Sequence, residues 1–184
     1  MTDAPAVVAA TEAWLASVVI GLNLCPFARK PQRAGTIRYA VSSARDDEAV
    51  MADLLRECQL LDEQPAEQLE TTLLIIPEHL QDFFDFNHFL NLADWLLERY
   101  SYTGVYQLAT FHPHYQFADT APDDAENLTN RAPYPILHLL REDSMAKVLD
   151  QYPDPEAIPE NNIRRVSALS EAQRRQLFPY LFAT

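Results

Sequence analysis

The chain has 184 residues, of which 48% are hydrophobic, and a formal net charge of −13. This length suits one domain with a core that needs no disulfide or structural metal, so we expect a single domain over residues 1–184. The negative charge repels phosphate backbones and anionic lipid, which excludes nucleic acid and membrane surfaces as expected partners.

The first half of the chain predicts alternating helices and strands. Asp3 caps a first helix with apolar residues at helical spacing, and Gly21 and Pro26 end it. Residues Thr36–Val41 alternate and include β-branched and aromatic types, which predicts a strand. Ser43 then starts a second helix with an apolar residue every three or four positions.

The second half predicts a buried strand, a long helix, two further strands and two short helices. The polar stretch between the last two strands, and the Pro-rich passage Tyr152–Pro159, are expected to be loops. In order, the expected elements are Thr71–Ile76, Pro77 to about Tyr100, Val105–Phe111, Pro135–Leu140, Ser144–Gln151, and a last helix from the capping box Ser170/Gln173 to about Phe182.

This order predicts an α/β fold, with α+β as the runner-up: a roughly four-stranded mixed sheet flanked by helices. The order βαβαββα resembles the thioredoxin-type topology. The Cys-x-x-Cys pair that such oxidoreductases place after the first strand is absent, since Ser42–Asp46 occupies that position. A ferredoxin-like sandwich is the alternative fold.

Cysteine use and the N-terminus indicate the compartment. Two cysteines, Cys25 and Cys58, do not make a secreted disulfide framework. The N-terminus lacks the basic region of a signal peptide, and the apolar stretch near Ala6–Leu24 is interrupted by polar residues. We therefore expect a cytoplasmic protein.

Residues Phe111–Glu142 are the expected functional segment, because a connection of roughly 20 residues without obvious secondary structure is uncommon in a compact domain unless it is functional. Imidazoles and carboxylates there, together with a nearby thiol, are candidates for acid–base or nucleophilic catalysis. A divalent metal is also possible, with His112, His114 and Asp119 as ligands. The candidate catalytic residues are His112, His114, His138, Asp119, Asp124 and Cys25.

A second interpretation of the same segment is structural. Asp, Asn and Thr side chains bond nearby backbone amides, and the prolines stiffen the path of the chain. Under this interpretation Asn127, Asn130 and Arg131 are only braces of a self-structured surface loop.

A second passage, Gly21–Gly35, is a local cationic region, because no acidic residue lies between Glu12 and Asp46. It could receive a small anionic ligand such as a phosphate or carboxylate, or it could pair with the protein's own acidic surface. The candidate ligand-binding residues are Arg29, Lys30, Arg33, Asn130, Arg131, Tyr134 and Arg141.

The two cysteines have different expected environments. Cys25 lies beside the cationic region, where positive charge would favour its thiolate and a redox role. Packing under the first helix is the alternative. Cys58 falls on the apolar stripe of the second helix, where an inert, structural thiol is expected.

The two passages together resemble a known family. Gly21-Leu-Asn-Leu-Cys-Pro-Phe-Ala28, and the run from Thr110-Phe-His-Pro through Tyr134-Pro-Ile-Leu-His-Leu-Leu-Arg-Glu142, look like the bacterial domain-of-unknown-function family fourteen-fifteen. The resemblance covers essentially the full chain, although Ala132 stands where the pattern leads us to expect serine. It implies no established activity, mechanism or cofactor.

Three functions are therefore open. The first is an enzyme or ligand-binding domain with a pocket between Phe111–Glu142 and Cys25–Arg33. The second is a thiol redox protein that uses Cys25, and the third is a non-catalytic interaction domain. Convergence of the candidate residues around a cleft would favour the first, whereas divergence without a concave pocket would favour the third. The cofactor, substrate and oligomeric state are left open.

Overall fold

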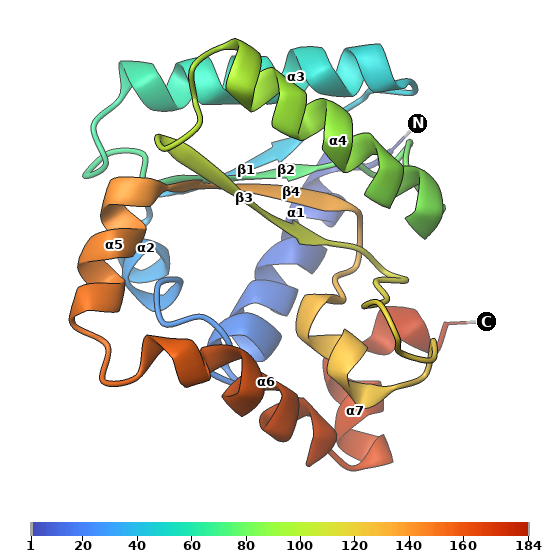
Figure 1. Cartoon of the computed structure of the whole chain (residues 1–184). Coiled ribbons are helices and arrows are strands. Elements are labelled where there is room, and N and C mark those ends of the chain that lie inside the picture. Colours follow the sequence, from blue (N-terminus) through green and yellow to red (C-terminus); the bar gives the residue numbers. More distant parts are fainter. Residues whose placement is uncertain (1, 184) are drawn as a thin grey trace.

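A four-stranded mixed sheet lies at the centre of residues 2–183, the part of the chain that the computed structural model describes (Figure 1). Strands β1 and β2 are parallel, and β4 runs antiparallel to both of its neighbours. Its strands, in the order β1-β2-β4-β3, are β1 (Ile37–Val41), β2 (Thr71–Ile75), β3 (Tyr106–Phe111) and β4 (Ile136–Arg141).

Helices cover both faces of this sheet. Two long helices, α3 (Asp47–Glu63) and α4 (Phe83–Arg99), lie on one face, and α1 (Ala4–Trp14) lies on the other (Figure 1). The remaining helical elements are η1 (Leu15–Ile20), α2 (Arg29–Ala34), η2 (Ala125–Asn130), α5 (Glu142–Asp150), η3 (Pro155–Ala157), α6 (Ile158–Ser167), α7 (Glu171–Leu177) and η4 (Pro179–Leu181).

The alternation of side chains along the strands divides the core in two. Leu74 and Leu139 pack under α3 and α4, whereas their neighbours Leu73 and Ile75 pack toward α1. Every residue of β2 is buried, because both faces of the sheet are covered. None of the helices in the described part is both long enough and apolar enough to cross a membrane.

The predicted α/β class, the four-stranded mixed sheet and the element order βαβαββα are confirmed. The ferredoxin-like alternative is not found. That fold requires its second and third strands to follow one another directly, whereas α4 separates β2 from β3 here.

Two helices start later than predicted, because a carboxylate caps each of them. The second helix was expected from Ser43, but Asp46 accepts the amide of Ala49 at 2.8 Å and α3 begins at its next residue. The third was expected from Pro77, but Asp82 accepts two first-turn amides and α4 begins only after it. An N-cap carboxylate satisfies amides that have no partner within the helix, so these positions set the starts.

The first helix continues as predicted toward Gly21, but its end widens into the π-helix η1. The amide of Gly21 bonds the carbonyl of Ala16 at 3.0 Å, five residues earlier. A Cβ atom on Gly21 would lie 2.2 Å from the carbonyl oxygen of Ser17, so only glycine fits there. Such π-helical turns are frequent at functional sites, and this one leads directly to Cys25.

Four helical elements, α2, η2, η3 and α6, were not predicted. The passage Tyr152–Pro159 was expected to be a loop, but it contains η3 and the first residues of α6. Pro155 and Pro159 stand in the first turns of these elements, where a proline forfeits no intrahelical hydrogen bond. The prolines therefore mark helix starts in this passage.

Candidate functional site

A cavity of about 450 Å³ lies on the α1 side of the sheet, where three parts of the chain that are distant in sequence meet. They are the end of η1 with the residues that follow it, the segment from the end of β3 to η2, and helix α6. The lining residues are Val19, Leu24, Cys25, Phe111, Phe117, Glu126, Thr129, Asn130, Ile158, Pro159, Asn162 and Ile163. We refer to this space as the central cavity.

Helix α6 forms the wall of the central cavity that lies farthest from the sheet. The amide nitrogen Nδ2 of Asn162 donates to the carbonyl of Leu24 at 2.7 Å, and Arg165 donates to the carbonyl of Asn23. Because a carbonyl oxygen only accepts, Nδ2 of Asn162 must face Leu24. Its Oδ1 is consequently left buried and without a partner among the described residues.

The segment between β3 and β4 supplies the remaining polar groups of the cavity. Asn130 donates to the carbonyl of Thr110 at 3.0 Å, which ties η2 to the end of β3. The hydroxyl of Thr129 donates to the backbone carbonyl of Glu126 at 2.9 Å. The carboxylate of Glu126 forms no ion pair within residues 2–183, and no lysine or arginine lines the cavity.

Cys25 lies between the central cavity and a second depression of about 350 Å³, which Arg29 also lines. Burial raises the pKa of the Cys25 thiol, although the backbone amides of Phe27 and Ala28 favour the thiolate. The thiolate that the cationic region was expected to favour is therefore not the preferred form, since desolvation outweighs those amides. Cys58 is completely buried, as expected for a structural thiol.

His112 is a completely buried brace between two loops. Its Nε2 donates to the carbonyl of Leu80 at 3.0 Å, and its Nδ1 accepts the amide of His114 at 2.9 Å. The ring packs against Phe83 and Phe86, with centroids 5.4 and 5.0 Å away. Burial lowers the pKa of His112 to about 4, so the ring is neutral at pH 7 with both nitrogens occupied.

His138 lies in the middle of the sheet and is only 8% exposed. The hydroxyl of Thr71 donates to the carbonyl of Leu139, so Nε2 of His138 donates to that hydroxyl oxygen at 2.8 Å. Burial lowers the pKa of His138 to about 4, which makes this ring neutral as well. Neither buried histidine lines the central cavity.

The three proposed metal ligands do not converge. The nitrogens of His112 are both in hydrogen bonds, whereas His114 is exposed and Asp119 stands on an exposed turn with a φ of 62°. Within residues 2–183, no group of three or more histidine, cysteine or carboxylate side chains is placed to hold a metal ion. The candidate Asp124 instead accepts the amide of Ala121 at 2.9 Å.

Several hydrogen bonds agree with the interpretation of the segment as a self-structured loop. Asn127 is completely buried; its Oδ1 accepts the amide of Phe117 at 2.9 Å, and its Nδ2 donates to the carbonyl of Ala121 at 2.8 Å. Arg131 donates to the carbonyls of Tyr115 and Pro122 at 2.9 and 2.6 Å. These bonds hold the loop in one shape, and the cavity wall is built on that shape.

The other candidate ligand-binding residues lie apart from the central cavity. Arg131 and His114 share a shallow depression of about 280 Å³ at the start of α4. Tyr134 lines a different depression, next to Trp14. Lys30 and Arg33 are exposed on α2.

Arg141 braces the other end of β4. Its guanidinium donates to the carbonyls of Leu61, Gln64 and Leu69, at distances of 2.7 to 3.2 Å. These carbonyls belong to the end of α3 and the loop after it, where a cation also complements the helix dipole. Arg141 is therefore occupied by the protein's own backbone.

Of the candidate site residues, the central cavity thus contains Cys25 and Asn130. They come from the two passages that were expected to form opposite walls. The residues of α6 were missed, above all Asn162 and Ile163. The only sequence signal was the spacing of Ile158, Asn162 and Val166 after a proline-rich stretch, which fits one face of a helix.

Comparison with known proteins gives one match. The family described as "Protein of unknown function (DUF1415)" matches residues 6–176, nearly the whole chain. No curated protein and no solved structure matches the chain.

Proposed function

The chain belongs to the DUF1415 family, whose description assigns no activity, and from the geometry of its own residues we propose that it is a small-molecule-binding domain. The ligand occupies the central cavity. The observation that carries the proposal is the joint lining of this space by Cys25, the Phe111–Asn130 segment and α6.

The size and lining of the cavity support this proposal. Pockets for small molecules are concave, mostly apolar, and about 300–1,000 Å³ in volume, with a few polar groups that orient the ligand. The central cavity has a volume of about 450 Å³ and is lined mainly by aliphatic and aromatic side chains. Asn130, Asn162 and Glu126 would supply the orienting groups.

The hydrogen bonds of the histidines favour binding over acid–base catalysis. His112 and His138 are neutral, buried, and engaged with other parts of the protein. A general base must reach the proton that it removes, and neither ring lines the cavity. The two cysteines are unpaired, which fits the reducing cytoplasm that we propose as the compartment.

The interaction-domain alternative finds less support. It requires that the candidate metal ligands diverge and that no concave pocket is present. The ligands do diverge, but the central cavity is a concave pocket. The exposed aromatic residues Phe84 and Trp95 on α4, which are 79% and 56% exposed, are the main surface feature that speaks for it.

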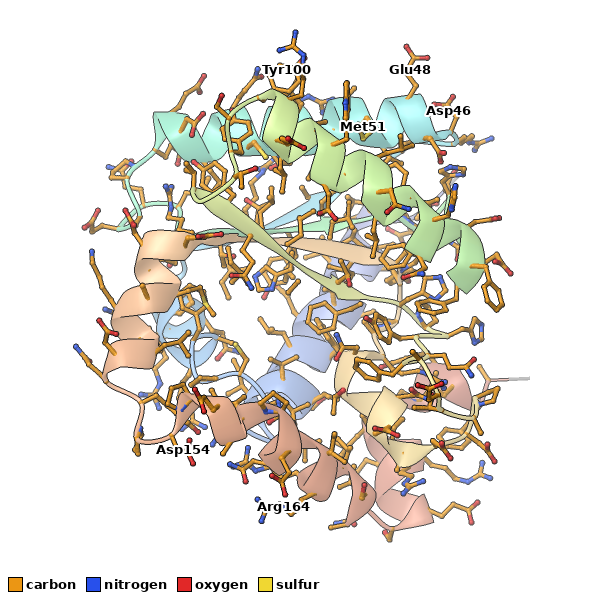
Figure 2. The ribbon with its side chains drawn as sticks, in the orientation of Figure 1. Asp46, Glu48, Met51, Tyr100, Asp154 and Arg164 are labelled. Atoms are coloured by element: carbon orange, nitrogen blue, oxygen red, sulfur yellow. The ribbon has the colours of Figure 1, made fainter. Side chains whose placement is uncertain are left out.

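The test fills the cavity from α6. Ile163 lines the cavity but is 37% exposed, so a tryptophan in its place can reach the cavity without disturbing the core. The matched control is Arg164→Trp, because Arg164 points outward from α6, away from the sheet (Figure 2). Calorimetric titration with naphthylmethanol, a neutral apolar probe, measures binding.

We expect saturable binding that Ile163→Trp weakens by about tenfold or more, since the added ring occupies the space of the ligand. Arg164→Trp should leave the affinity within about twofold of the wild type. Circular dichroism verifies that both variants are folded. Equal weakening by both variants would refute the proposal, as would a wild type that binds neither naphthylmethanol nor its amine analogue naphthylmethylamine.

A further inference from the structure

The polar groups of the central cavity also indicate which chemical class of ligand it accepts. This inference rests on the proposed function and adds the identity of the polar group that the ligand carries. Two side chains of the lining, Asn162 and Glu126, carry the argument, because each has an oxygen atom without a hydrogen-bond or ion-pair partner within residues 2–183.

The first oxygen is Oδ1 of Asn162. It is buried in the cavity wall, and its position is fixed because Nδ2 of the same amide holds the carbonyl of Leu24. A buried acceptor without a hydrogen bond costs about 1–3 kcal/mol relative to one that is bonded. A ligand that donates to this oxygen recovers that cost, whereas a ligand that only accepts cannot.

The second group is the carboxylate of Glu126 on η2, the element that packs against α6 beside the cavity. An ionised carboxylate accepts hydrogen bonds and donates none. No arginine or lysine among residues 2–183 lines the cavity to balance its charge, and the whole chain carries a net charge of −13. Glu126 is therefore the charged residue of the lining, and its carboxylate favours a cation over an anion beside it.

The other polar groups of the lining do not reverse this preference. The hydroxyl hydrogen of Thr129 and one amide hydrogen of Asn130 are directed to protein oxygens. The second amide hydrogen of Asn130 is a neutral donor and does not offset the charge of the Glu126 carboxylate. Arg29, on the far side of Cys25, lines the neighbouring depression and not the central cavity. The anionic ligand expected from the cationic region is therefore not the ligand that this lining favours.

From these contacts we infer that the central cavity binds a hydrophobic amine: an apolar body with an ammonium group that donates to Oδ1 of Asn162 and to the carboxylate of Glu126. The apolar body lies against Phe111, Phe117 and Ile163. Charge-assisted hydrogen bonds are about twice as strong as neutral ones, so the ammonium group supplies the selectivity.

Four probes with one apolar body and different polar groups test this inference: naphthylmethylamine, naphthylmethanol, methylnaphthalene and naphthoate. They are titrated into the full chain by calorimetry. We expect the amine to bind about tenfold more tightly than the alcohol, and the alcohol more tightly than methylnaphthalene, which has no donor. Naphthoate, an anion, should bind most weakly.

Glu126→Gln is the discriminating variant, and Glu160→Gln is its matched control. Both remove one negative charge, but Glu160 is exposed on α6 and does not line the cavity. Glu126→Gln should reduce the advantage of the amine over the alcohol to about twofold or less. Glu160→Gln should retain most of that advantage.

The inference and the proposed function fail in different ways. Equal affinities for the four probes, tightest binding of naphthoate, or an unchanged amine preference in Glu126→Gln would overturn the inference. If Ile163→Trp still weakens binding of the probes by about tenfold or more, the ligand-binding function stands without the amine preference. If none of the probes binds, the proposed function itself is refuted.

Discussion

Replacement of His112 by alanine tests whether this histidine is a structural brace or a catalytic group. The change leaves the buried carbonyl of Leu80 and the half-buried amide of His114 without their partners. Each such group costs about 1–3 kcal/mol when it is buried and unpaired. Loss of the ring between Phe83 and Phe86 adds a cavity, so we expect a total loss of roughly 3–5 kcal/mol.

Urea unfolding, followed by circular dichroism and tryptophan fluorescence, measures this loss in the free energy of unfolding. The matched control is His114→Ala, because its imidazole is exposed and only its backbone amide bonds His112. The control should change stability by less than about 0.5 kcal/mol. His112→Gln keeps one polar group in the site and should fall between the two. A loss below about 1 kcal/mol in His112→Ala would refute the structural role.

Four further predictions concern other parts of the fold. Because His112 and His138 have folded pKa values of about 4, against about 6.5 when unfolded, protons bind the unfolded chain first. The free energy of unfolding should therefore fall as the pH drops from about 6.5 to about 4, and His138→Gln should flatten this dependence. Identical pH profiles of the wild type and His138→Gln would contradict a contribution of His138. Gly21→Ala should lower stability by roughly 1–3 kcal/mol in thermal unfolding, because the new Cβ meets the Ser17 carbonyl, whereas Gly35→Asn, at an open left-handed position, should be tolerated. Arg141→Met should lower the free energy of unfolding in urea by roughly 2–4 kcal/mol, since three carbonyls lose their donor. Arg56 is exposed, and a loss in Arg141→Met no larger than that in Arg56→Met would argue against the bracing role of Arg141. Iodoacetamide should alkylate Cys25 with an apparent pKa above the free-thiol value of about 8.5, and rapid reaction at pH 6 would disprove the effect of burial.

The fold was predictable because its signals are local. The apolar run Thr71–Ile76 and the helical spacing of Val50, Leu54 and Leu61 depend on residues close together in the chain. Errors occurred at the helix starts, where capping by Asp46 and Asp82 prevailed over earlier candidate positions. Periodicity describes the middle of a helix, whereas its start depends on which side chain bonds the free amides.

The site was only partly predictable, because its contacts are distant in sequence. The polar segment and Cys25 stand out by composition, and Cys25 and Asn130 do line one cavity. The partner of His112, however, is the carbonyl of Leu80, 32 residues away. The sequence near these two residues contains no signal that predicts this hydrogen bond. The same holds for Asn162 and Leu24, which are 138 residues apart.

The central claim is that the space between Cys25, η2 and α6 binds a ligand. Amide NMR spectra of the chain, recorded during titration with naphthylmethylamine, test it most directly. We predict saturable shift changes that concentrate at Leu24, Thr129 and Ile163 and vanish in Ile163→Trp. Shift changes that concentrate around Trp95 on α4, or that are absent altogether, would contradict the claim.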